Sequence, residues 1–114
     1  TTWRDNFDSQ FHTERIRRHE EDKEILETFA MREVAEHSGN HEDAILQTES
    51  LCAIFGNSLC RNHEIGDIKR IAWCREYLIE LRDQLSNQSI EHLFKPEQND
   101  IINRYLDIPF APNE

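Results

Sequence analysis

The stretch SLCRNHEIGD, from Ser58 to Asp67, marks the place where two helical patterns meet. Before and within it, apolar residues recur every four positions, at Leu51, Phe55 and Leu59. This spacing is typical of a helix buried on one face. Gly66 interrupts the pattern, and Asp67 belongs to a residue type that caps helix N-termini. We therefore predict one helix over 42–62 and a second over 67–85, joined by a turn.

The second of these predicted helices carries an apolar seam. Its members follow alternating three- and four-residue steps, at Ile71, Cys74, Leu78, Leu81 and Leu85. Such a seam suits an antiparallel neighbouring helix or the same helix of a second subunit. Trp73 and Tyr77 share a face that is offset from the seam, which predicts a helix that is apolar on two sides.

The N-terminal segment predicts a helix over 8–37 with an unusual middle. Aromatic residues recur every four positions at its start, and an apolar stripe resumes at Ile25, Phe29 and Val34. Between them, residues 12–24 (HTERIRRHEEDKE) offer only Ile16. Since a continuous helix would leave these turns in solvent, we expect it either to project beyond the domain or to break there. Gly39 suits the left-handed position after its end.

The C-terminal segment predicts short elements. A helical turn is expected over 90–94, and Pro96 suits the first turn of a last short helix that runs through Leu106. The tail contains Pro109 and Pro112 and should be extended. The fold class is therefore all-α: one domain over 1–114, with three longer helices, a short C-terminal helix and an extended proline-containing tail. Residues 1–7 and 107–114 are expected to be frayed or docked extensions.

The pair Cys60 and His63 is the most site-like feature. Its spacing relative to Cys74 matches no strong zinc pattern, and the pair His37 and His41 would lie about 30 Å away along the helix. A thiol nucleophile at Cys60 would also need an orienting third group, which the sequence does not indicate. We predict no catalytic residue, no metal site and no cofactor. A metal-dependent or thiol enzyme would require Cys60, His63 and an acidic residue to converge in a cleft.

One basic cluster, RIRRH over 15–19, precedes three acidic residues. Along a helix, Arg17 and Glu21, and Arg18 and Asp22, are neighbours that can neutralise each other. A charged solvent face is therefore the expected role of the cluster, and binding of an acidic partner or a phosphate backbone is the alternative.

Charge and cysteine usage restrict the partners. The 114 residues carry a formal net charge of −10, so nucleic acid and anionic lipid are disfavoured partners. Three cysteines outside any tight framework indicate free thiols in a reducing, intracellular compartment, cytoplasm or nucleus. No apolar run is long enough to cross a membrane.

The sequence has more apolar surface than one small core needs. We predict a partner interface formed by Trp3, Phe7, Phe11, Trp73, Tyr77, Ile108 and Phe110. The alternative is that the aromatic ends fold back over the same core. The leading functional hypothesis is a non-enzymatic protein-protein interaction or oligomerisation domain of a regulatory assembly, as a homodimer or hetero-complex, with an apolar groove built from the first and third long helices. The second hypothesis is a small acidic inhibitor that imitates nucleic acid in a basic cleft.

Overall fold

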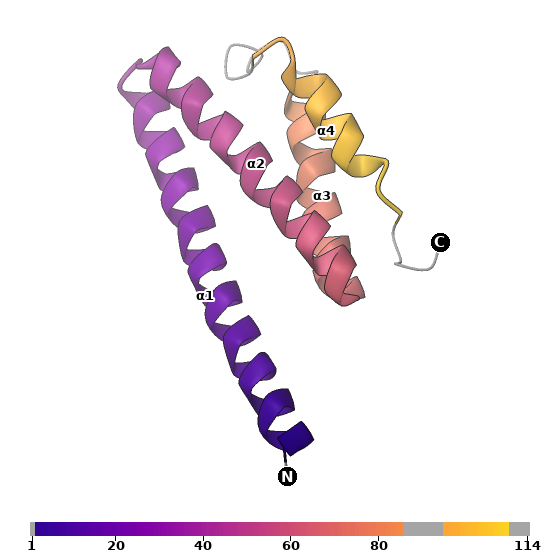
Figure 1. Ribbon diagram of the computed structural model, residues 1–114. Helices are drawn as coiled ribbons and strands as arrows, with labels where there is room; N and C mark the ends of the chain where they lie inside the picture. The colour runs from indigo at the N-terminus through magenta and orange to yellow at the C-terminus, as the bar shows by residue number, and fades with distance from the viewer. Residues whose placement is uncertain (1, 86–94, 110–114) are drawn as a thin grey trace.

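The computed structural model describes the backbone of residues 2–85 and 95–109, and the side chains of residues 12–85 and 95–109. It contains the helices α1 (Thr2–His37), α2 (His41–Ile65), α3 (Ile68–Leu85) and α4 (Gln98–Leu106) (Figure 1). Over these ranges no strand occurs, so the predicted all-α class, with three long helices and a short C-terminal one, is confirmed. The turn predicted over 90–94, and the tail beyond residue 109, lie outside the described residues.

The turn between α2 and α3 lies where the sequence predicts it. Gly66 adopts the left-handed conformation with φ 76°, and the Arg70 N–H donates to Asp67 Oδ1 at 3.1 Å, which caps α3. The helix α2 runs to Ile65, three residues further than predicted. The helix ends there because Gly66 is left-handed and a Schellman pair closes the last turn: the Asp67 N–H donates to the Asn62 carbonyl at 3.0 Å, and the Gly66 N–H donates to the His63 carbonyl at 3.4 Å.

The core is organised around α2, which packs against α1 on one side and against α3 and α4 on the other (Figure 1). Phe55 lies at its centre and is completely buried. The core cluster consists of Ile25, Leu51, Cys52, Phe55, Leu59, Cys74, Leu78, Leu81 and Ile102. Most of these residues belong to the apolar stripes that the sequence displays, because a helical repeat places them on one face.

The short helix α4 packs closely on α2 at a glycine. Gly56 is buried in the middle of α2, and the ring of Tyr105 lies directly over its Cα. The end of α4 is held by Arg75 of α3, whose Nη1 donates to the carbonyl oxygens of Leu106 at 2.9 Å and Ile108 at 2.7 Å. This close approach fixes α4 against the α2–α3 pair.

Replacing Gly56 by alanine tests this contact. In an open helix the change would stabilise by about 1 kcal/mol, but here a Cβ atom would overlap the Tyr105 ring. We expect Gly56→Ala to lower the free energy of unfolding by about 1–2 kcal/mol, the usual cost of overpacking. Urea denaturation measures the effect. In a Tyr105→Ala background the same substitution should become neutral or stabilising, and a stabilised single variant would contradict the contact.

The helix α1 is continuous from Thr2 to His37, so the expected break in residues 12–24 does not occur. Its first turns extend past the α2–α3 turn (Figure 1). Most residues over 12–24 are exposed, as the projecting alternative predicts, but Glu21 and Asp22 are partly buried against α2 and α3. The predicted break was wrong, and the polar contacts of Glu21 and Asp22 were not predicted because the sequence pattern counts only apolar contacts. The side chains of Trp3, Phe7 and Phe11 lie outside the described ones.

Candidate functional site

A groove separates α1 from α3. Both helices pack on α2, but in the described part of the chain no Cα atom of α1 lies within 8 Å of one in α3. The space between them has a volume of about 610 Å³. The residues that define this α1/α3 groove are Asp22, Ile25, Leu26 and Phe29 from α1, and Arg70, Trp73, Tyr77, Glu80, Leu81 and Gln84 from α3.

An aromatic cluster forms the floor of the α1/α3 groove. The ring of Tyr77 stacks parallel on Phe55 with centroids 4.8 Å apart, and lies 6.4 Å from Phe29 of α1. Trp73 meets Tyr77 edge-on at 5.1 Å, and the Arg70 guanidinium lies over the Trp73 ring at 3.8 Å. Because each ring is in contact with others, the floor is well packed and preformed.

The wall formed by α1 exposes an apolar side chain. Leu26 is 70% exposed although it lines the groove. It lies one position beyond the Ile25 stripe, so it faces α3 rather than α2. Leu26 is not among the interface residues that the sequence pattern predicts. The signal available was the adjacent apolar pair at 25 and 26, which widens the apolar face toward a second neighbour.

The structure separates the predicted interface residues. Trp73 and Tyr77 lie together on the α3 wall of the groove, half-buried and packed on the core. Ile108 also packs on the core, beyond α4 and outside the groove lining, as the alternative of a folded-back end predicts for this residue. Phe110 and the side chains of Trp3, Phe7 and Phe11 lie outside the described residues.

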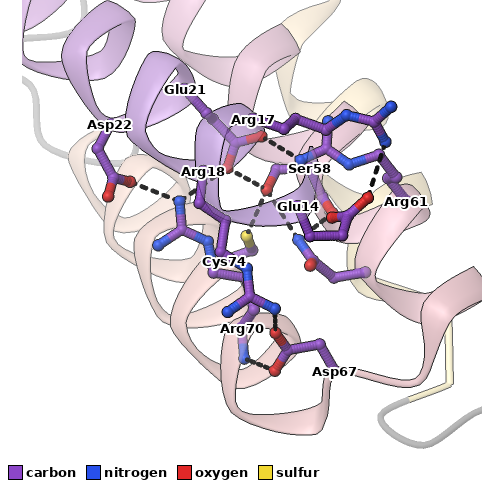
Figure 2. A network of polar contacts seen from close by, with 11 residues as sticks. Glu14, Arg17, Arg18, Glu21, Asp22, Ser58, Arg61, Asp67, Arg70 and Cys74 are labelled. Carbon is purple, nitrogen blue, oxygen red and sulfur yellow. Dashed lines mark hydrogen bonds and ion pairs between the residues drawn. The ribbon is translucent and has the colours of Figure 1, made fainter. Parts of the chain in front are cut away.

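At one end of the groove a buried ion-pair network joins α1 to α2 and α3 (Figure 2). Glu21 Oε1 accepts hydrogen bonds from Ser58 Oγ at 2.6 Å and from Arg70 Nη2 at 2.8 Å, and Oε2 accepts one from Arg61 Nη2 at 3.1 Å. Arg70 Nη2 also donates to Asp22 Oδ1 at 2.5 Å. The Glu21 and Arg70 side chains are only 10% and 15% exposed. These contacts explain why α1 remains packed where its sequence is charged.

Two arginines of the basic cluster over 15–19 form ion pairs within the molecule. Arg18 of α1 pairs with Asp67 in the α2–α3 turn, and Arg17 pairs with Glu14 at 3.3 Å (Figure 2). The intrahelical pairs predicted for both arginines are replaced, since their expected partners are bound by α2 and α3 instead. Glu21 is only 10% exposed, and an ion pair is stronger in such a partly buried position than between two exposed neighbours on one helix. Contacts to α2 and α3 therefore replace the contacts within α1.

Cys60 and His63 lie near the end of α2, and both are half-buried. Within the described residues, no group of three or more His, Cys, Asp or Glu side chains is placed to hold a metal ion. Cys74, the third member considered, is buried and donates through Sγ to Ser58 Oγ at 3.4 Å. The structure therefore places Cys74 beside the ion-pair network.

Burial raises the pKa of the Cys52 thiol from 9.0 to about 11, although nearby Arg32 partly offsets the shift. As pH rises from 9 to 11, the unfolded thiol ionises while the folded one stays neutral. Stability from this group is therefore complete below pH 9 and is lost toward pH 11. We expect the urea midpoint to fall more steeply over this range in the wild type than in Cys52→Ala. Parallel declines would contradict the assignment.

These features define a small all-α bundle of helices α1 to α4 with an open groove and a buried ion-pair network. The chain matches no family model, no curated protein and no solved structure. None of the described helices combines the length and the apolar character that crossing a membrane requires.

Proposed function

We propose that this chain is a helical protein-protein interaction domain without enzymatic activity, and that it binds a helix of a partner protein in the α1/α3 groove. The observation that carries the proposal is the exposed Leu26 beside a preformed aromatic floor. A large apolar side chain at such a position loses water contact when a partner covers it, which stabilises the complex.

The shape of the groove favours a helix as its occupant. The helices α1 and α3 both pack on α2, and over the described residues they meet each other only through side chains. A helix laid opposite α2 would therefore form a four-helix arrangement with α1, α2 and α3. Helices bind in this way when an apolar face meets an apolar groove, with anchors at three- and four-residue spacing. The anchors would contact Leu26, Trp73 and Tyr77.

The acidic inhibitor is the second candidate, and the net charge of −10 supports it. Several carboxylates of the described chain are, however, neutralised by arginines of the same molecule, among them Glu21 and Asp67. A mimic of nucleic acid needs a continuous field of unpaired carboxylates. The groove therefore supports the interaction domain better, and the homodimer remains a prediction that solution mass tests.

A displayed library of helical peptides tests the proposed function. Each peptide of about 18 residues keeps a fixed apolar face, and its other positions vary among Lys, Gln and Glu. We expect selected peptides to bind the wild type and to lose about tenfold or more in affinity with Leu26→Glu. The matched control is Leu46→Glu, at a 54% exposed position of α2 outside the α1/α3 groove.

Light scattering over a dilution series accompanies the selection. A dimer that Leu26→Glu dissociates would support the groove as an assembly surface with a second copy as occupant. If no peptide is enriched and the chain stays monomeric, or if enriched peptides bind Leu26→Glu equally well, the proposed function is wrong.

A further inference from the structure

We propose that the occupant of the α1/α3 groove is a cationic amphipathic helix, an inference that rests on the proposed function. The groove presents carboxylates on both walls, Asp22 on α1 and Glu80 on α3. Asp22 is 50% exposed and shares its arginine, Arg70, with Glu21, whereas Glu80 is exposed. Basic side chains flanking an apolar face would meet both carboxylates while the apolar face covers the aromatic floor.

The positive charge in the groove is already neutralised. Among the described residues that line it, Arg70 alone is cationic. Its guanidinium binds Glu21 and Asp22 and covers Trp73. An acidic segment would therefore find no free cation in the lining, and the net charge of −10 would repel it at long range.

The same reasoning disfavours a second copy. A two-fold contact brings the same surface of each subunit face to face. Here it would set Asp22 and Glu80 of one copy against those of the other, between molecules that each carry a charge of −10. Like charges across an interface weaken binding, whereas a cationic helix is attracted to both walls.

The positions of the two carboxylates set a spacing for the partner. The helices α1 and α3 run parallel, since Asp22 pairs with Arg70 at one end of the groove and Arg32 Nη2 donates a hydrogen bond to Gln84 Oε1 at the other. Asp22 is therefore level with Arg70, and Glu80 lies ten residues further along, or about 15 Å. A helix that meets both carries basic residues about ten positions apart, on opposite flanks of its apolar face.

Three synthetic peptides of about 18 residues test the inference. They share one apolar face and differ only at the two flanking positions and their neighbours, which are all Lys, all Gln or all Glu. Binding is measured by NMR titration of the protein, with the indole signal of Trp73 as the groove reporter. We expect the Lys peptide to bind about tenfold more tightly than the Gln peptide at low salt, an advantage that high salt removes.

Matched variants separate local contact from overall charge. Glu80→Gln should weaken the Lys peptide about threefold and leave the Gln peptide unchanged, which is the scale of one exposed ion pair. Glu76→Gln removes the same charge from an exposed position of α3 outside the groove lining and should have no such effect.

The outcomes distinguish the inference from the proposed function. Equal binding of the Lys and Gln peptides, or equal effects of Glu76→Gln and Glu80→Gln, would overturn the cationic partner while leaving a helix-binding groove in place. A dimer dissociated by Leu26→Glu would overturn it in the same way. If none of the three peptides shifts the Trp73 signal and the protein does not self-associate, both proposals fail.

Discussion

Replacing Glu21 by alanine is expected to lower the free energy of unfolding by about 3 kcal/mol, the scale for removing one partner of a buried ion pair. The carboxylate is only 10% exposed and accepts hydrogen bonds from α2 and α3. Its removal leaves Arg61 without that ion-pair partner, and leaves Asp22 as the remaining ion-pair partner of Arg70. Urea denaturation followed by circular dichroism measures the loss.

A matched control is available at the preceding position. Glu20 is exposed, and Glu20→Ala removes the same charge from the same helix, so its effect should stay within about 0.5 kcal/mol. A double-mutant cycle with Arg70→Ala should then show clear non-additivity, because the two side chains are in direct contact. Equal small losses for Glu20→Ala and Glu21→Ala would mean that the ion-pair network does not hold α1.

Replacing Phe55 by alanine is expected to cost about 4 kcal/mol, within the range for large-to-small changes in a core. Phe55 is completely buried at the centre of α2. It contacts an aromatic ring from α1 and two from α3. Since domains of this size are stable by about 5–15 kcal/mol, the variant should be close to unfolding at elevated temperature.

Thermal and urea denaturation measure this effect, and two variants calibrate it. Phe55→Leu keeps most of the buried volume and should cost distinctly less than Phe55→Ala. Leu46→Ala removes an apolar side chain from an exposed position of the same helix and should cost little. Comparable losses for Leu46→Ala and Phe55→Ala would contradict the central position of Phe55 in the core.

The helices and turns could be predicted from sequence because they depend on local patterns. The stripe through Leu51, Phe55 and Leu59 identifies the buried face of α2, and Gly66 with Asp67 identifies its end. These signals lie within a few residues of the structure that they specify. The helix α1 differed, because its middle turns bind residues that lie 37 to 49 positions away. No helical repeat records such partners.

The groove was partly predictable for the same reason. The offset of Trp73 and Tyr77 from the α3 seam predicts a second apolar face, and both residues line the groove. Their contact with Phe55 was not predictable, since it depends on how α3 is rotated and placed against α2. This contact also means that charged substitutions of Trp73 would disturb the core, so Leu26 is the cleaner probe.

The ion-pair network also determines the axial register of α1, that is, its position along the helices α2 and α3. An apolar seam can accommodate a slip of one helical turn, because one aliphatic side chain substitutes for another. Glu21 has to meet Ser58, Arg61 and Arg70 at once, and a slip of about 5 Å would break all three contacts. Charged residues in the middle of α1 thus select a single longitudinal position, in which Leu26 and Phe29 stand opposite Trp73 and Tyr77.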